Sequence, residues 1–249
     1  MTAARLQAAL GERAFRYYDQ VGSTNDLAHD WLLAGAQSGG VIIADEQVSG
    51  RGRMGRGWYA PPGTALMLSM VLHPGSDVVG RVNLLGGVAV CEALEALGAR
   101  DVGLKWPNDV WLQRRKVCGV LAEAHWQADR LIGAILGMGI NVRVDFAGTP
   151  FADTAISLET VTGPVDRLTL LTHLLARLDH WRAPLASDAL FEAWRARLQM
   201  IGDPVAIKVL HETISGIAAG VTPDGALLVR QSDGSLRAVA AGDLALGGH

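Results

Sequence analysis

The chain has 249 residues, of which 49% are hydrophobic and 19% are charged, and its formal net charge at pH 7 is −3. This length and apolar content predict a packed core in one domain of ordinary size, with room for a small second domain. The slightly acidic balance argues against nucleic acid as the main partner, because surfaces that track phosphate backbones carry an excess of positive charge.

The sequence shows no apolar run long enough to cross a membrane, and its N-terminal stretch lacks the apolar core of a signal peptide. We therefore expect a cytoplasmic protein with no membrane partner. Its two cysteines, Cys91 and Cys118, fall in different predicted elements and have no metal-ligand spacing. Buried free thiols are favoured over a disulfide or a zinc site.

Three small polar residues, Ser23, Thr24 and Asn25, follow a strand predicted over residues 14–18 and precede a helix predicted over residues 26–33. A hydroxyl at this place can cap the helix by accepting a hydrogen bond from an amide of the first turn. The same residues can instead bind a polar group of a ligand. The sequence leaves both interpretations open.

The segment from residue 45 to residue 62 concentrates backbone freedom and positive charge. Between residues 50 and 57 it holds four glycines and three arginines. The apolar runs on either side, at 41–44 and 66–72, are predicted to be buried strands. A loop of this composition is typical of a flap whose amides and guanidinium groups close over an anion. The alternative is a solvated Arg/Gly loop that binds nothing.

A second dense segment is KWPND at residues 105–109. It places a cation, an aromatic ring, a rigid turn and two side-chain acceptors between short strands predicted at 103–104 and 110–112. Such a concentration of polar groups indicates a functional site. A simple turn would nevertheless account for Pro107 and Asn108 without any function.

Lys116 stands at the start of an apolar strand predicted over residues 117–126, directly after Arg114 and Arg115. The two arginines are most simply the solvated tip of a hairpin. The ammonium group of Lys116 would be costly at the entry of an apolar strand without an anionic partner. Lys116 is therefore the better candidate for a site residue.

A further strand, predicted over residues 130–144, completes a hairpin with the strand before it. It carries Gly137, Gly139 and Asn141. Glycine inside a strand often marks a place where another group approaches the backbone closely. We expect such an approach here.

Helices with apolar faces are predicted over residues 81–97, 166–181 and 187–198. The pattern changes at residue 202, where a Gly-Asp-Pro sequence marks a boundary. Short strands are then predicted at residues 205–210, 213–222, 226–231 and 236–241. Asp-Gly turns between them indicate a small antiparallel barrel, which we expect to pack against the larger domain or to position a partner.

Three of these segments share their order and spacing with a known family. They are GRGRMGRGW at 50–58, KWPND at 105–109 followed by Lys116, and GIN at 139–141. In these segments, and over essentially its whole length, the chain resembles the biotin protein ligases of the kind without an N-terminal DNA-binding domain. The resemblance implies an α+β fold: residues 1–201 form a class II synthetase-like catalytic domain, a mixed β-sheet flanked by helices, and residues 202–249 form an SH3-like barrel.

The resemblance also implies a site for biotin beside a site for ATP. The ureido ring of biotin would be held by four polar residues: Ser23, Thr24, Asn25 and Gln47. The flap would close over the biotin carboxylate and the nucleotide phosphate with Arg51, Gly52 and Arg53, and Lys116 would bind the carboxyl group. The nucleotide would contact residues of all three segments: Arg51, Arg53, Arg56, Trp58, Asn108 and Asn141. The flap departs from many in the family at Met54, and no metal ligands are implied.

Such an enzyme would join biotin to a lysine of a biotin carboxyl carrier protein of acetyl-CoA carboxylase in two steps. First, the biotin carboxylate attacks the α-phosphorus of ATP to form biotinyl-AMP. Because both reactants are anions, this step requires cations, here Arg51, Arg53, Lys116 and Mg²⁺. In the second step a lysine amine attacks the activated carbonyl, with Asp109 as the candidate that orients or deprotonates the amine and Lys105 as its support.

Two other functions remain open at this point. A lipoate-protein ligase would activate a different acid with the same architecture, although its flexible substrate has no ureido ring to match the polar turn at Ser23. A non-catalytic regulator would bind a small molecule without turnover. We expect no DNA contact, because few residues precede that turn, and a monomer or a weak homodimer formed through an exposed sheet edge.

Overall fold

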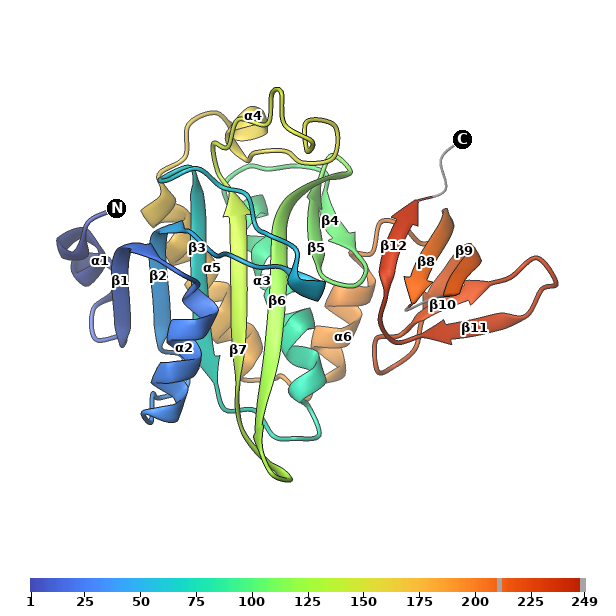
Figure 1. The fold of residues 1–249 in the computed structure, drawn as a ribbon, viewed down its shortest axis with the longest axis horizontal. Coiled ribbons are helices and arrows are strands. Elements are labelled where there is room, and N and C mark those ends of the chain that lie inside the picture. Colours follow the sequence, from blue (N-terminus) through green and yellow to red (C-terminus); the bar gives the residue numbers. More distant parts are fainter. Residues whose placement is uncertain (210–211, 247–249) are drawn as a thin grey trace.

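The computed structural model describes residues 1–209 and 212–246, and these form two β-sheets (Figure 1). The large sheet has the strand order β1-β2-β3-β7-β6-β5-β4. Its strands are β1 (Phe15–Val21), β2 (Val41–Gln47), β3 (Ala65–Leu72), β4 (Val102–Lys105), β5 (Asp109–Leu112), β6 (Arg115–Gln127) and β7 (Arg130–Asn141). The β1–β2 pair is parallel and the other neighbours are antiparallel, so the sheet is mixed, as predicted.

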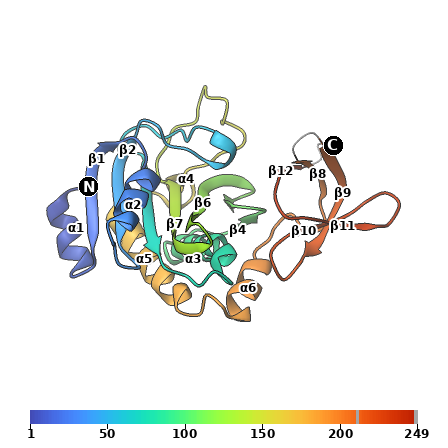
Figure 2. The same ribbon diagram turned by 60° about the horizontal axis from the view of Figure 1, so that its bottom comes forward.

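Six α-helices are formed in the described residues: α1 (Ala3–Leu10), α2 (Thr24–Leu33), α3 (Val82–Ala96), α4 (Glu159–Thr162), α5 (Arg167–Arg182) and α6 (Asp188–Arg195). Helix α2 lies on one face of the large sheet, and α3 and α5 lie together on the other (Figures 1 and 2). Alternation along β2 explains the two faces. Ile42 packs with Leu32 of α2, whereas Val41 and Ile43 belong to the cluster that includes α3 and α5.

Helix α3 approaches the sheet closely because two consecutive glycines lie on it. A Cβ atom on Gly86 would lie 2.7 Å from Cγ1 of Val120, and one on Gly87 would lie 3.1 Å from the side chain of Leu104. The helix predicted over residues 81–97 is therefore confirmed, and close packing explains its tolerance of glycine, which is otherwise a poor helix former.

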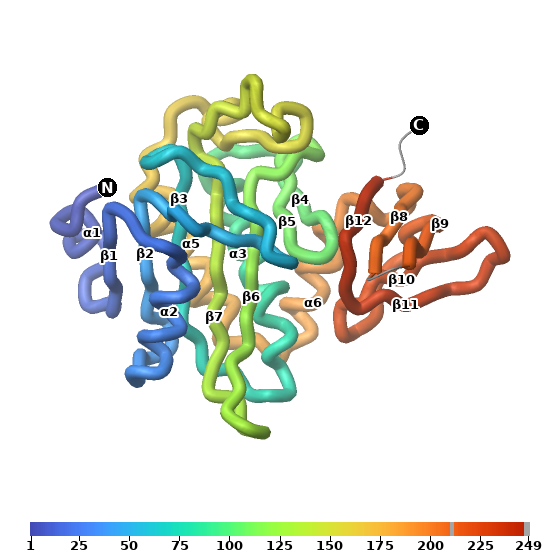
Figure 3. The backbone as a smooth tube through the Cα atoms, in the orientation of Figure 1, coloured from blue at the N-terminus to red at the C-terminus, as the bar shows by residue number. Residues whose placement is uncertain are grey.

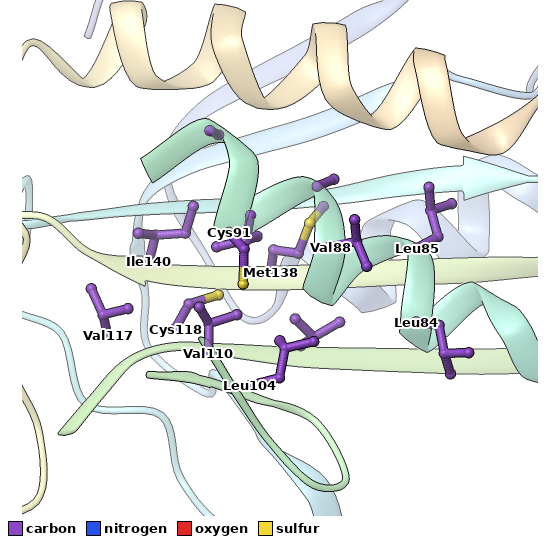
Figure 4. Close-up of a cluster of buried hydrophobic side chains, with 14 of the residues drawn as sticks. Leu84, Leu85, Val88, Cys91, Leu104, Val110, Val117, Cys118, Met138 and Ile140 are labelled. Atoms are coloured by element: carbon purple, nitrogen blue, oxygen red, sulfur yellow. The ribbon is translucent and has the colours of Figure 1, made fainter. Parts of the chain in front are cut away.

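Both cysteines lie in the core between α3 and the sheet. Cys91 of α3 and Cys118 of β6 are buried and unpaired, among side chains such as Val88, Met138 and Ile140 (Figure 4). Burial raises the pKa of both thiols far above its usual value, since a thiolate there would be desolvated. The prediction of buried free thiols is confirmed.

The small sheet has the order β11-β10-β9-β8-β12, and all of its neighbours are antiparallel. Its strands are β8 (Pro204–Val209), β9 (Glu212–Val221), β10 (Leu227–Arg230), β11 (Leu236–Val239) and β12 (Asp243–Leu246). Four of them were expected, and residue 210 of the first expected strand lies outside the described residues. Strand β12 was missed because it is short and is held by backbone pairing to β8 rather than by its own apolar pattern.

Trp106 connects the two sheets. Its ring is 2% exposed, and its Nε1 donates a hydrogen bond of 3.0 Å to the carbonyl of Gly225, in the turn between β9 and β10. Arg114, at the tip of the β5–β6 hairpin, donates to the carbonyl of Gln199 and pairs with Asp203 beside β8. The tip is therefore a contact between domains as well as a solvated turn.

Replacing Trp106 with phenylalanine removes the donor and leaves the Gly225 carbonyl without its partner. We expect the free energy of unfolding to fall by about 1–3 kcal/mol, which lowers the melting temperature by roughly 2–4 °C per kcal/mol in a chain of this size. Thermal unfolding followed by circular dichroism measures the change. Trp126→Phe is the control, because Trp126 is 48% exposed; equal melting temperatures for the two variants would contradict the prediction.

Candidate active site

One face of the β6–β7 pair brings the three sequence segments together. The segment between β2 and β3, which contains the flap, crosses in front of β7 and β6 (Figure 3). Gly119 of β6 pairs with Gly139 of β7, and Leu121 pairs with Gly137. This glycine strip, defined as Gly119, Gly137 and Gly139, leaves the strand backbones open to approach by other groups.

Trp58 lies directly against the glycine strip. A Cβ atom on Gly139 would be 2.7 Å from the indole ring, and one on Gly119 would be 3.2 Å from it. The Nε1 donor of Trp58 is buried and has no hydrogen-bond partner among the described residues. Lys116 Nζ lies 5.8 Å from the ring centroid. An unused buried donor at this place fits a site built to receive a polar ligand.

Gly137 faces the polar turn formed by Ser23, Thr24 and Asn25. A Cβ atom on Gly137 would lie 2.2 Å from Oδ1 of Asn25, so only glycine fits there. The close approach expected at Gly137 and Gly139 is therefore confirmed, with Asn25 and Trp58 as the approaching groups.

The polar turn begins α2 two residues earlier than predicted. Ser23 is the N-cap residue, but its side chain makes no capping hydrogen bond and is 4% exposed. The backbone N–H of Thr24 donates 2.7 Å to Oε1 of Gln47, and the Thr24 hydroxyl lies 3.0 Å from the same atom. A side chain from β2 thus satisfies a first-turn amide, and the Ser23 hydroxyl is left for another partner.

Asn25 is held by two residues that the sequence analysis did not single out. Its Nδ2 donates to Oε2 of Glu123, and its Oδ1 accepts a 2.6 Å hydrogen bond from Ser69. Ser69 is fully buried in the apolar strand β3. A lone hydroxyl in such a strand, and a carboxylate that follows the apolar part of β6, were the signals available in the sequence.

Arg51 is the flap arginine that lies beside the polar turn. Its Nη2 is 2.6 Å from Oδ1 of Asp26 and 3.6 Å from Oε1 of Glu123. The hydrogen bond to Asp26 raises the pKa of Arg51 above its usual value, with a smaller contribution from Glu123. The guanidinium group is therefore held by carboxylates at this end of the glycine strip.

The other two flap arginines face the small sheet. Arg53 donates 3.4 Å to the carbonyl of Gly242, and Arg56 pairs with Asp243. Burial lowers the pKa of Arg53. Between them the backbone turns through Met54, which has a positive φ of 57° and is 70% exposed. Met54 is the solvent-facing tip of the flap, and the Gly52 amide closes the turn by donating to the carbonyl of Arg56.

Lys116 has the anionic partner that its position requires. Its Nζ lies 2.7 Å from Oδ1 of Asp109, and both side chains are partly exposed. Lys105 faces Asp109 across the β4–β5 pair. Burial lowers the pKa of Lys105, since desolvation penalises its charged form. The end of the site opposite the polar turn thus carries two lysines and one carboxylate.

Asn108 and Asn141 both support the backbone around Lys116. Nδ2 of Asn108 donates to the carbonyl of Val120 at 2.7 Å. Nδ2 of Asn141 lies 3.3 Å from the carbonyl of Lys116. Oδ1 of Asn141 is buried without a partner in the part of the chain that the structure describes. It is a second unused polar atom beside the strip, and it fits a ligand that donates a hydrogen bond.

Comparison with known proteins identifies this arrangement. Residues 17–141 match the model of the biotin/lipoate A/B protein ligase family. The chain belongs to that family. Residues 200–247 also match the model of the biotin protein ligase C-terminal domain. The predicted α+β class, with a catalytic mixed sheet and a small C-terminal antiparallel domain, is confirmed.

Individual relatives agree with the family model. The biotin–(acetyl-CoA-carboxylase) ligase of Mycobacterium tuberculosis is 33% identical, over 95% of this chain and 90% of the relative. The bifunctional ligase/repressor BirA of Escherichia coli is 33% identical, over 91% of this chain and 72% of the relative. Among solved structures, the biotin protein ligase from Aquifex aeolicus in complex with biotin and ATP superposes with a TM-score of 0.80 at 28% identity, over 94% of this chain and 98% of that one.

Gly139→Ala tests whether the glycine strip is needed for ligand binding. The new methyl group would collide with the Trp58 ring, so we expect the indole to leave the strip and the affinity for biotin to fall about tenfold or more. Intrinsic tryptophan fluorescence and a biotin titration measure the two effects. Gly80→Ala is the control, because a Cβ atom there meets nothing within 4 Å and the backbone of Gly80 is not in the left-handed region. Unchanged fluorescence and affinity in Gly139→Ala would refute the role of the strip.

Proposed function

We propose that this protein is an ATP-dependent biotin–(acetyl-CoA-carboxylase) ligase, which forms biotinyl-AMP and transfers biotin to a lysine of the carboxyl carrier protein. One observation carries the proposal. A single strip along β6 and β7 has a polar turn at one end and Lys116 at the other, with Trp58 packed between them. This order matches an elongated molecule that has a hydrogen-bonding ring at one end and a carboxylate at the other.

Biotin would extend from the polar turn to Lys116, past the Trp58 ring that covers Gly119 and Gly139. Ser23, Thr24, Asn25 and Gln47 would bind its ureido ring, and the unused Ser23 hydroxyl is suited to direct contact. The Lys116 ammonium group would bind the carboxyl oxygen. Gly52 and Arg53 would close the flap over that carboxylate and the nucleotide phosphate. Arg51, which Asp26 and Glu123 hold beside the polar turn, would join them by exchanging these carboxylates for the substrate anions.

ATP would lie against the flap and the Lys116 end of the strip. The nucleotide-binding residues we propose are Arg51, Arg53, Arg56, Trp58, Asn108 and Asn141. The buried donor of Trp58 and the buried acceptor of Asn141 support this assignment. Mg²⁺ would arrive with the phosphates and neutralise their charge. Residues 1–209 and 212–246 contain no group of three or more His, Cys, Asp or Glu side chains placed to hold a metal ion by themselves.

In the first step, Lys116 and the flap arginines reduce the repulsion between the carboxylate and the α-phosphate and align them for attack. Pyrophosphate leaves and a mixed anhydride remains. The closed flap keeps water from this anhydride, because an ordered loop over it excludes solvent from the activated carbonyl.

In the second step, the neutral amine of the carrier lysine attacks the activated carbonyl and AMP leaves. Asp109 would orient this amine or accept its proton. Its position supports the role, because its carboxylate lies 2.7 Å from Lys116 at the carboxyl end of the site. Lys105, opposite Asp109 on β4, would support the charge balance there.

A lipoate-protein ligase is the second candidate, because the family model covers both activities. The polar turn with Gln47 favours biotin, since lipoate has no ureido ring to use these groups. A non-catalytic regulator would bind biotin without consuming ATP. Consumption of ATP in the presence of biotin distinguishes the enzyme from such a regulator.

We also propose the cytoplasm as the place of action, where ATP is supplied and free thiols such as Cys91 and Cys118 persist. No described helix combines the length and apolarity needed to span a membrane. We further propose a domain boundary between residues 201 and 202, supported by the start of β8 at Pro204, and a monomer or weak homodimer that does not bind DNA.

The decisive experiment incubates the protein with biotin, Mg²⁺-ATP and a purified carrier domain, followed by mass measurement of the carrier. We expect a mass gain of one biotinyl group that disappears when ATP is omitted. Lipoate replaces biotin in a parallel sample. A gain with lipoate alone would favour the second candidate, and no gain with either acid would refute the proposal.

Lys116→Ala removes the cation at the carboxylate end of the strip. We expect the rate of biotinyl-AMP formation to fall by about 10²–10³-fold, with little change in melting temperature because the Lys116–Asp109 pair is partly exposed. Biotin-dependent pyrophosphate release measures the rate. Arg115→Ala is the control on the neighbouring residue. A normal rate in Lys116→Ala would show that its role is assigned wrongly.

Arg51→Ala removes the flap cation nearest the polar turn. We expect the fold to persist and free biotinyl-AMP to escape several-fold faster, because the flap loses a contact that closes it. Release is followed by separating free intermediate from protein in the absence of a carrier. Met54→Ala is the control at the exposed flap tip. Unchanged retention of biotinyl-AMP in Arg51→Ala would contradict the proposed role of Arg51 in closing the flap.

A further inference from the structure

Glu123 ends a chain of close polar contacts beneath the polar turn. Its Oε2 accepts from Nδ2 of Asn25, and Oδ1 of Asn25 accepts from the Ser69 hydroxyl at 2.6 Å. Ser69 Oγ lies 2.7 Å from Thr24 Oγ1, which lies 3.0 Å from Oε1 of Gln47. The chain therefore links β6, β3 and β2 through residues that are buried around the first turn of α2.

The two ends of this chain fix the orientations of the Asn25 and Gln47 side-chain amides. An ionised carboxylate only accepts, so Glu123 forces Asn25 to present its Nδ2 there and its Oδ1 to Ser69. At the other end, the Thr24 backbone N–H only donates, so Gln47 must present its Oε1. Ser69 and Thr24 supply two hydroxyl protons for their three contacts with Asn25, with each other and with Gln47, so one of these contacts has no proton. The orientations of the Asn25 and Gln47 amides are set by Glu123 and one backbone amide.

A comparison of Asp26 with Glu123 separates two roles of a carboxylate at this place: orienting the Asn25 amide and pairing with the charge of Arg51. Both carboxylates lie near the Arg51 guanidinium group, Asp26 at 2.6 Å and Glu123 at 3.6 Å. Only Glu123 also contacts Asn25. Asp26 is therefore the closer partner of the flap arginine, and among the described residues its side chain makes no hydrogen bond to Thr24, Asn25, Ser69 or Gln47.

We propose that Glu123 is a positioning residue for the ureido end of the acid-binding site. It acts through Asn25, whose amide it orients. The site thereby presents a fixed arrangement of hydrogen-bond donors and acceptors to a ring that carries two N–H donors and one carbonyl acceptor. Such an arrangement discriminates strongly between acids with and without this ring, because a ligand that leaves a buried polar group unpaired binds at a cost in free energy. The proposal rests on the proposed biotin ligase function.

The test compares three variants of the full chain: Glu123→Ala, Glu123→Gln and Asp26→Asn. Pyrophosphate release gives KM for biotin, KM for ATP and kcat, and thermal unfolding monitors the fold. We expect Glu123→Ala to raise KM for biotin about tenfold or more and to leave KM for ATP nearly unchanged. The melting temperature should fall, because the buried Nδ2 of Asn25 loses its acceptor. Glutamine retains an oxygen that accepts from Asn25, so Glu123→Gln should restore most of the affinity. Asp26→Asn should change KM for biotin by less than about threefold.

Several results would overturn the proposal. One is a KM for biotin in Glu123→Ala equal to that of the wild type, and another is an equal rise in this KM in Glu123→Ala and Glu123→Gln. A third is a rise in KM for biotin in Asp26→Asn as large as that in Glu123→Ala. A fourth is an equal rise in KM for biotin and KM for ATP in Glu123→Ala. The wild-type protein is the internal reference. If it shows no biotin-dependent pyrophosphate release, the proposed function fails and the role of Glu123 fails with it. Normal wild-type activity with an unaffected Glu123→Ala variant rejects the role of Glu123 alone.

Discussion

The absence of side chains along the glycine strip is the constraint on which the site depends. At Gly119, Gly137 and Gly139 the strand backbones of β6 and β7 are approached directly by Trp58 and Asn25. A methyl group at Gly137 or Gly139 would lie well inside van der Waals contact with these residues. The strip therefore brings the partly buried ring of Trp58 and the buried amide of Asn25 onto the same sheet face. The site runs along the strands from a polar end to a cationic end.

Electrostatics at the two ends follow from the same arrangement. Arg51, Arg56 and Lys116 each pair with a carboxylate: Asp26, Asp243 and Asp109 respectively. All these partners are partly exposed, and exposed ion pairs contribute little to stability. Anionic substrates can therefore compete with the carboxylates without unfolding the site. Because Asp243 belongs to the small sheet, the C-terminal domain takes part in the charge balance of the flap.

Most elements were predictable because their signals are local. The buried apolar runs of β2 and β3 and the cap of α5 at Asp166 each depend on neighbours in the sequence, and Asp166 indeed accepts from the Leu168 amide. Strand β12 and the start of α2 were not predicted in place. The former depends on backbone pairing with β8, and the latter depends on Gln47, which satisfies the Thr24 amide from another element. Such partners are invisible to a local pattern.

The sequence by itself determined the chemical groups of the site: the flap arginines, Lys116, the polar turn and the glycines that admit close neighbours. It also determined the family, because three motifs keep their order and spacing. Only the tertiary structure decided which groups meet, that Lys116 is balanced by Asp109 and that Asn25 is held by Ser69 and Glu123. The physical reason is separation along the chain. Asn25 and Glu123 are 98 residues apart, and only the pairing of β3, β7 and β6 beneath α2 brings them within hydrogen-bond distance.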